Sequence, residues 1–251
     1  MTAPLVLQGR RALVTGASRN LGAAVARALA AEGARVALNF RQSASEAHEV
    51  LDSLTGSGHL LVAGDVGTVL GADAVVAEVE RSAGLVDVLV NNAGPFSMTP
   101  YLQLDPEEFD AIWKANLRSV YLVTRRVAPG MLAAGWGRII NISAGSAFVR
   151  NHSVYSLAKE AVITLTEQLA LELGPAVTVN CVAPGQIAES AEEMSRIDPD
   201  FVNTVMSRTP AGRLVTRAEV AGIVVALCST TFDMVTGVTI AVDGGGHLPV
   251  A

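Results

Sequence analysis

A tyrosine and a lysine four residues apart, Tyr155 and Lys159, are the residues whose types and spacing most directly suggest chemistry. If the segment is helical, the two side chains lie on one face, one turn apart. A phenol loses its proton at about pH 10 in water, and a neighbouring ammonium group favours the phenolate and lowers that pKa. Such a tyrosine could exchange a proton with a substrate oxygen near neutral pH. Many unrelated helices share this spacing by chance, so the pair needs support from the rest of the chain.

A glycine-rich segment near the start of the chain has the spacing of a phosphate-binding turn. It runs from Thr15 to Gly22, between an apolar segment and an Ala-rich segment with helical periodicity. In such a turn, backbone N–H groups and the helix N-terminus face a pyrophosphate. Gly16 would permit the tight turn, and Gly22 would let the helix pack closely on the strand. Asn20 stands where a middle glycine is expected, and asparagine tolerates left-handed backbone angles. A purely structural turn is the alternative.

The end of the second apolar segment bears on which dinucleotide would bind. An Asp or Glu there would select NAD by hydrogen bonding to the ribose 2′-hydroxyl. This sequence has Asn39, Phe40 and Arg41 at that point, with no acid. Arg19 and Arg41 could both pair with a 2′-phosphate through charge-assisted hydrogen bonds. The sequence therefore predicts NADP(H) rather than NAD(H), with two ordinary surface arginines as the alternative.

Short apolar segments alternate along the chain with longer segments of helical periodicity. We predict strands at 12–15, 35–39, 60–63, 86–91, 138–143, 178–182 and 239–242. We predict helices at 21–32, 43–54, 68–82, 106–134, 153–173 and 217–229. This α/β alternation predicts a single domain, residues 1–251, with a doubly wound parallel sheet of about seven strands and helices on both faces. Segment 186–213 is long for a connection, so we expect a substrate lid there, or else a packed helical insertion.

The composition limits the classes of protein to which the chain can belong. Half of the 251 residues are hydrophobic and 17% are charged, which favours a large buried core over disorder. The net charge is −6 and no basic stripe is visible, so we expect no nucleic-acid partner. Cys181 and Cys228 lack metal-ligand spacing, so we predict no metal site and a reducing, cytoplasmic setting. The sequence shows neither a signal peptide nor an apolar run of membrane-spanning length.

Further motifs occur in an order that characterises one family. Asn92-Ala93-Gly94 follows the fourth predicted strand, Asn116 lies within the long helical segment, and Pro184-Gly185 follows the sixth strand. With Tyr155 and Lys159, these motifs make the chain resemble the short-chain dehydrogenase/reductase superfamily over nearly its whole length. The 3-oxoacyl-carrier-protein-reductase-like members are closest in style. The resemblance implies a Rossmann-type fold, an NADP(H)-dependent oxidoreductase that interconverts a ketone and a secondary alcohol, and a homotetramer or homodimer.

The same resemblance implies a role for each matching residue. Tyr155 would be the general acid/base, Lys159 would hold the nicotinamide ribose, and Asn116 would anchor a water of the proton relay. The implied cofactor contacts follow the chain from the glycine-rich turn to the nicotinamide end. They are Gly16, Ser18, Arg19, Asn20, Leu21, Gly22, Asn39, Arg41, Asp65, Val66, Asn92, Ala93, Gly94, Tyr155, Lys159, Pro184, Gly185 and Ile187.

The chain departs from the family pattern at the serine that would bond the substrate oxygen. The family reads Asn-Ile-Ser-Ser at the end of the fifth strand, but this chain has Ala144 at the second serine position. The loop to Tyr155 is also about two residues short. We predict that Ser143 serves as the fourth catalytic residue, with Ser146 as the alternative, and with no serine contact as a third option.

Two further departures bear on function. Glu189 stands where the family often has a threonine that bonds the nicotinamide carboxamide, and no Lys or Arg follows Arg126 in its helix to dock an acidic carrier protein. We therefore expect a free small-molecule carbonyl or alcohol as substrate, with a carrier-bound substrate, for which Arg125 and Arg126 are present, as the alternative. His152 could reach the pocket, but we do not count it as catalytic. A different class also stays open, namely a dinucleotide-binding sensor or partner subunit that has lost catalysis.

Overall fold

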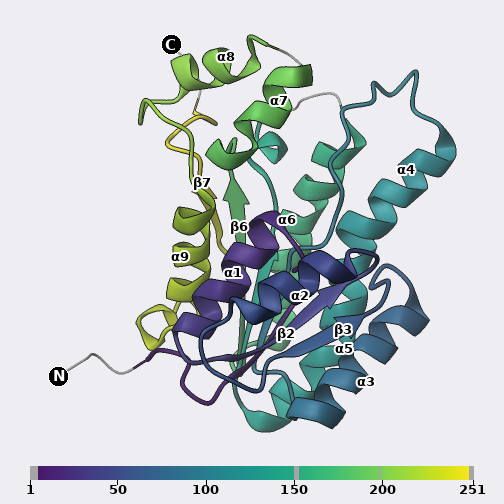
Figure 1. Cartoon of the computed structure of the whole chain (residues 1–251), viewed down its shortest axis with the longest axis vertical. Helices are drawn as coiled ribbons and strands as arrows, with labels where there is room; N and C mark the ends of the chain where they lie inside the picture. The colour runs from purple at the N-terminus through teal and green to yellow at the C-terminus, as the bar shows by residue number, and fades with distance from the viewer. Residues whose placement is uncertain (1–4, 150–152, 198, 249–251) are drawn as a thin grey trace.

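The computed structural model describes residues 5–149, 153–197 and 199–248. Its strands form one parallel sheet in the order β3-β2-β1-β4-β5-β6-β7, which confirms the predicted fold class (Figure 1). The order reverses between β1 and β4, where ligands of open α/β sheets bind. The strands are β1 (Arg11–Val14), β2 (Arg35–Phe40), β3 (Leu60–Ala63), β4 (Val88–Asn91), β5 (Gly137–Ile142), β6 (Val177–Pro184) and β7 (Thr239–Val242).

Alternate residues of each strand point to opposite faces, so both faces of the sheet are apolar. Ala12 and Val14 of β1 belong to one buried cluster, and Leu13 belongs to the other. The first cluster is covered by α1 (Asn20–Ala31), α2 (Ala44–Asp52) and α9 (Arg217–Leu227). The second is covered by α3 (Val69–Ala83), α5 (Ser119–Ala134) and α6 (Val154–Leu173). The described residues contain no helix that is both long and apolar enough to cross a membrane.

The long helix predicted at 106–134 is helical throughout but is not uniform. It consists of α4 (Pro106–Trp113), a π-helical turn at Lys114–Arg118, and α5. A π turn inserts an extra residue into the helical ladder, and such turns occur frequently at functional sites. Asn116 lies in the middle of this turn and is fully buried.

The segment predicted as a lid, 186–213, is mostly helical. It contains a 3₁₀ turn at Ala188–Ser190, α7 (Ala191–Ile197) and α8 (Phe201–Arg208). In Figure 1 the two helices stand beyond the tip of β6, at the edge of the sheet where the strands end. Gln186, Met194, Phe201 and Val205 from this segment line the cleft described below.

Candidate active site

A cleft of about 980 Å³ lies at the carboxyl ends of the strands. The residues that line this cleft include Ala144, Ser146 and Phe96. Asn116 is not a lining residue, but its neighbour Ala115 is. The cleft is lined by all the residues predicted to contact the cofactor and by Ser143, that is, by Gly16, Ser18, Arg19, Asn20, Leu21, Gly22, Asn39, Arg41, Asp65, Val66, Asn92, Ala93, Gly94, Ser143, Tyr155, Lys159, Pro184, Gly185 and Ile187.

The glycine-rich turn has the backbone that its sequence requires. Gly16 has a φ of +63°, and a Cβ there would lie 2.9 Å from the Cα of Ala93. A Cβ at Gly22 would overlap the carbonyl oxygen of Gly16. Asn20 has a φ of +52°, so it takes the left-handed conformation expected of it. The two glycines therefore allow close backbone approaches in the turn, at whose end the N-terminus of α1 lies beside the cleft, and this arrangement suits a pyrophosphate.

Thr15 connects the end of β4 to this turn by hydrogen bonds, a role that the sequence did not predict. Its Oγ1 accepts hydrogen bonds from the backbone N–H groups of Asn92 at 3.0 Å and Ala93 at 3.1 Å. The side-chain amide of Asn92 donates to the carbonyl oxygens of Thr15 and Gly16, both at 3.0 Å. Asn92 thus positions the turn, because its amide hydrogens are directed to the backbone of the turn.

The end of β2 carries polar groups at the part of the cleft where a 2′-phosphate would lie. Asn39 is buried, and its Nδ2 donates to the carbonyl oxygens of Val62 at 3.1 Å and Gly64 at 3.2 Å. Arg19 and Arg41 are exposed, and within the described part of the chain neither guanidinium makes a hydrogen bond or an ion pair. Both cations are therefore available to an anionic ligand.

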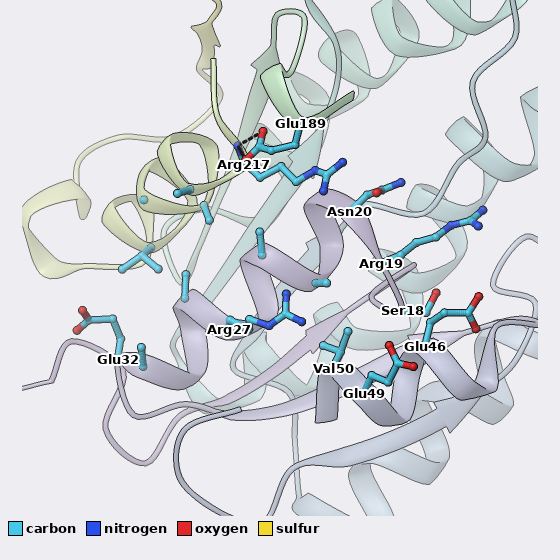
Figure 2. A pocket seen from close by; sticks show the side chains of 18 residues that line it. Ser18, Arg19, Asn20, Arg27, Glu32, Glu46, Glu49, Val50, Glu189 and Arg217 are labelled. Atoms are coloured by element: carbon cyan, nitrogen blue, oxygen red, sulfur yellow. Dashed lines mark hydrogen bonds between the residues drawn. The ribbon is translucent and has the colours of Figure 1, made fainter. Parts of the chain in front are cut away.

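A second groove, of about 810 Å³, runs between α1, α2 and the start of α9 and shares Arg19 and Asn20 with the cleft. Figure 2 shows Glu189 in this groove, joined to Arg217. The carboxylate of Glu189 accepts the backbone N–H of Arg217 at 3.1 and 3.2 Å, at the positive N-terminus of α9. The acid expected beside the carboxamide therefore faces α9, and Ser190 lines the cleft instead.

Helix α6 presents Tyr155 and Lys159 to the cleft. The Nζ of buried Lys159 donates to the carbonyl oxygen of Ile142 at 2.8 Å and lies 5.6 Å from the centre of the Tyr155 ring. Phe96 meets the tyrosine ring edge to face, with centroids 5.0 Å apart. Burial raises the pKa of Tyr155 to about 12 and lowers the pKa of Lys159 to about 8. The expected lowering of the tyrosine pKa by the lysine is therefore wrong for the chain alone, because burial dominates both groups.

A buried chain of amides and hydroxyls holds α6 against the sheet. The Nδ2 of Asn91 donates to Thr124 at 3.2 Å and to the Oδ1 of Asn141 at 2.9 Å. The Nδ2 of Asn141 in turn donates to Thr166 of α6 at 3.0 Å. Because each buried amide hydrogen bond depends on the next, the helix that carries Tyr155 is fixed relative to β4 and β5.

Asn116 lies behind the wall of the cleft. Its Nδ2 donates to the carbonyl oxygens of Pro95 at 3.0 Å and Ile112 at 3.1 Å. Its Oδ1 is buried without a hydrogen-bond partner in the described structure. A Cβ on Gly94, whose φ is +153°, would overlap this Oδ1. A buried, unpaired carbonyl oxygen is normally satisfied by water, which agrees with the water-anchoring role implied for Asn116.

The two candidate serines differ in what their hydroxyl groups do. The Oγ of Ser143 donates to the backbone carbonyl of Lys159 at 2.8 Å, so its single proton is already used. The Oγ of Ser146 is buried and has no partner in the described residues. Of the two serines, Ser146 is therefore the one whose hydroxyl is free to donate a hydrogen bond at the cleft. His152 lies outside the described residues.

The structure suits a nicotinamide dinucleotide. Glycines lie around the expected phosphate-binding position. Pro184, Gly185 and Ile187 line another part of the same cleft. In the described ranges, no group of three or more His, Cys, Asp and Glu side chains could hold a metal ion. The fold and the site together define an oxidoreductase of the dinucleotide-binding class.

The sequence model of a family described as enoyl-(acyl carrier protein) reductase matches residues 16–247. The chain is 38% identical to L-xylulose reductase of Homo sapiens over 96% of this chain and 98% of that protein. It is 36% identical to gluconate 5-dehydrogenase of Gluconobacter oxydans (strain 621H), over 95% of each. The chain belongs to the short-chain dehydrogenase/reductase family, whereas the 3-oxoacyl-carrier-protein-reductase-like subtype is only loosely supported.

A solved structure gives the same result at the level of the fold. The gluconate 5-dehydrogenase from Burkholderia cenocepacia J2315, in complex with NADP and tartrate, superposes with a TM-score of 0.90. The two chains are 33% identical, and 98% of each is covered. L-xylulose reductase and gluconate 5-dehydrogenase are oxidoreductases, and the likeness supports an enzyme of the hydride-transfer type acting on a CH–OH group.

Proposed function

We propose that this protein interconverts a ketone and a secondary alcohol on a small molecule, with NADP(H) as the hydride carrier and Tyr155 as the general acid/base. The observation that carries the proposal is that Tyr155 lines the same cleft as the phosphate-binding turn of Gly16 and Gly22. A dinucleotide bound along that cleft would have its phosphates at α1 and its nicotinamide near Pro184 and Gly185. The proton donor and the redox group would then share one substrate position.

The residues of the chain supply the proton and the orientation. When bound, the nicotinamide supplies a hydride to the carbonyl carbon of the substrate. Tyr155, with its pKa raised to about 12 by burial, holds its proton at neutral pH and donates it to the carbonyl oxygen. Lys159 is fixed to the carbonyl oxygen of Ile142 and presents its remaining N–H groups for the nicotinamide ribose. Asn116 holds the water that returns a proton to Tyr155.

The choice of NADP(H) over NAD(H) rests on Arg19 and Arg41. Both line the cleft, neither guanidinium forms a hydrogen bond or an ion pair with the described residues, and no acid stands at the end of β2, although Arg41 lies near enough to Asp65 to lower the pKa of that carboxyl. A relative of the same fold carries NADP, which supports the choice. Guanidinium groups bind phosphates through paired, charge-assisted hydrogen bonds, so two of them favour the 2′-phosphorylated cofactor.

The substrate is proposed to be a free carbonyl or alcohol in the cytoplasm rather than a carrier-bound one. Arg126, the last basic residue of α5, forms an ion pair with Glu80 at 2.7 Å, so it is not free to receive an acidic carrier. The names of the relatives point to small hydroxylated substrates. We also propose that residues 1–251 form one domain with 186–213 as its substrate lid, and that the protein is a homotetramer or homodimer, as the family resemblance implies.

The rival proposal is a sensor or partner subunit that binds the dinucleotide without catalysis, which Ala144 favours. The discriminating test is turnover of a ketone and alcohol panel by the wild type and by Tyr155→Phe, followed through NADPH absorbance. We expect a loss of about 10²- to 10⁴-fold in kcat/KM with unchanged NADPH affinity. Tyr121→Phe, at an exposed tyrosine of α5, is the matched control. Tight NADPH binding without turnover of any panel member would favour the rival.

A further inference from the structure

The cleft contains an imidazole–carboxylate pair that the proposed reaction does not use. Asp243 follows directly after β7, and His247 comes four residues later, at the end of a glycine-rich turn. The Nδ1 of His247 lies 2.7 Å from the Oδ2 of Asp243, and both residues line the cleft. The side chain of Asp243 is only 6% exposed, and that of His247 is 29% exposed. The carboxylate is thus covered, and the ring is left partly open to the cleft.

The turn between the two residues fixes their geometry. Gly244 and Gly245 have φ values of +65° and +86°, two consecutive left-handed positions that glycine adopts at the lowest cost. The Oδ1 of Asp243 accepts the N–H of Gly245 at 2.9 Å, and its Oδ2 accepts the N–H of His247 at 2.9 Å. The carboxylate therefore accepts hydrogen bonds from the backbone of the turn and contacts the imidazole ring of His247. This ring cannot rotate freely away from the carboxylate.

The pair lies where three parts of the site meet. A Cβ on Gly185 would be 2.6 Å from the Cβ of Asp243, so the carboxylate residue packs on the nicotinamide wall of the cleft. A Cβ on Gly244 would be 2.8 Å from Thr209, which follows lid helix α8. The ring of His247 lies 5.1 Å from the ring of Phe148, in the loop after β5. A substrate held beneath the lid would meet this ring.

The hydrogen-bond chemistry of the pair defines what it could recognise. A carboxylate that accepts from Nδ1 fixes the neutral imidazole as the tautomer with its proton on Nδ1. Nε2 then carries a lone pair and is an acceptor. In the described part of the chain, Nε2 has no hydrogen-bond partner. An acceptor directed in this way suits an O–H group of a ligand and does not suit a carboxylate.

We propose that His247, oriented by Asp243, accepts a hydrogen bond from a hydroxyl group of the substrate next to the reacting carbon. The protein would accordingly select hydroxylated ketones, such as ketoses and their polyols, over plain ketones of equal length. The inference rests on the proposed function, because it assigns a substrate class to the same site. His247 does not take part in proton transfer to the carbonyl oxygen, so its role is recognition.

The test compares two ketones that differ in hydroxyl groups, a ketopentose and 2-pentanone, in the wild type, His247→Phe and His247→Gln. His247→Phe keeps a ring against Phe148 but removes both nitrogens. We expect it to raise the KM for the ketopentose about 3- to 10-fold, the effect of one neutral hydrogen bond, and to leave the kinetics with 2-pentanone unchanged. His247→Gln retains an acceptor at a similar reach and should recover part of the loss. His48→Phe, at an exposed histidine of α2, is the control.

A second readout needs no turnover. A pentitol should raise the thermal unfolding midpoint of the NADPH-bound wild type and of His48→Phe, but not of His247→Phe. If that shift appears while no ketone is reduced, the proposed function fails and the recognition role stands. If His247→Phe alters the two ketones equally, or if the pentitol shift survives the substitution, the recognition role is overturned and the proposed function is untouched. If His247→Phe lost stability and nothing else, the recognition role would also be overturned, since the pair would then only stabilise the turn.

Discussion

The ammonium group of Lys159 donates a hydrogen bond to the backbone of β5 and lies over the ring of Tyr155, with no hydrogen bond to that tyrosine in the described structure. Its Nζ lies 2.8 Å from the carbonyl oxygen of Ile142 and 5.6 Å from the centre of the tyrosine ring. Burial therefore decides both pKa values, raising that of Tyr155 to about 12 and lowering that of Lys159 to about 8. In the free protein the tyrosine is neutral at pH 7, which is the form that a reductase needs for its proton donor.

The lowered pKa of Lys159 predicts a pH-dependent stability. In the unfolded chain this lysine keeps its proton to about pH 10.5, whereas in the folded chain it loses it at about pH 8. Between these values the unfolded state binds more protons, so the contribution of Lys159 to stability rises with pH. The free energy of unfolding of the wild type should rise relative to that of Lys159→Met, by at most about 1.4 kcal/mol per pH unit. Chemical denaturation from pH 7 to pH 10 measures the difference.

The comparison with Lys159→Met is needed because other buried groups act in the opposite direction. Burial raises the pKa of Cys181 to about 11 and that of Cys228 to about 12, so both oppose folding as the pH rises past the ordinary thiol range. The effect of Cys228 is common to both proteins and cancels in the difference, whereas that of Cys181 cancels only in part, because the Lys159 ammonium lowers the pKa of this thiol. Lys114→Met, at a half-exposed lysine paired with Asp65, is the control for the loss of a lysine charge at the protein surface. A difference that stays flat between pH 8 and pH 10 would contradict the prediction.

The two serines at the end of β5 should respond differently to substitution. Ser146→Ala removes the hydroxyl whose donor is free, so we expect kcat/KM to fall about 10²-fold with little change in NADPH affinity. Ser143→Ala removes the hydrogen bond to the carbonyl of Lys159, so we expect a loss of about 1 kcal/mol in stability and a smaller loss of activity. Steady-state kinetics and denaturation of both variants check the order. The reverse order would assign the substrate to Ser143, as the sequence spacing suggests.

The fold could be predicted from the sequence because its strands are buried on both faces. Continuous apolar runs mark such strands, and the predicted ranges agree with the observed ones within about two residues. The start of β4 is an instructive difference, since Val86 and Asp87 precede the observed strand. The carboxylate of Asp87 instead accepts from the backbone and side chain of Arg11, at 2.9 and 2.6 Å. A long-range pairing of this kind has no signature in local sequence.

The site could be predicted as a set of residues but not as a set of interactions. Order and spacing brought Asn20 and Tyr155 to one cleft, and the left-handed backbone of Asn20 followed from its residue type. The π turn at Asn116 was missed, because one inserted residue hardly changes the helical period. The hydrogen bond from Lys159 to Ile142 and the direction of the Glu189 side chain were also missed. Long flexible side chains can adopt many rotamers, and the residues that stabilise the observed rotamer are distant in the sequence.

The pair of arginines at the cleft predicts a measurable cofactor preference. Arg19→Ala and Arg41→Ala should each raise the Kd for NADPH about 10-fold, since a charged hydrogen bond contributes about 1.5 to 3 kcal/mol and exposure weakens it. The Kd for NADH should hardly change, because that cofactor has no 2′-phosphate. Fluorescence titration with both nucleotides measures the two constants. Arg27→Ala is the control, because Arg27 lies in the neighbouring groove and bonds Ser53. Equal losses for NADPH and NADH would mean that the arginines do not bind the 2′-phosphate.

Asn20 predicts how much the phosphate-binding turn depends on a left-handed residue. Its φ of +52° costs a residue with a side chain about 1 to 2 kcal/mol, and β-branched residues tolerate it least. Asn20→Gly should therefore keep or slightly raise stability, whereas Asn20→Val should lose about 1 to 2 kcal/mol and weaken NADPH binding. Denaturation and nucleotide titration give both quantities. If Asn20→Gly instead loses NADPH affinity as strongly as Asn20→Val, the amide side chain itself contacts the cofactor, and backbone angle is not the reason for asparagine at this position.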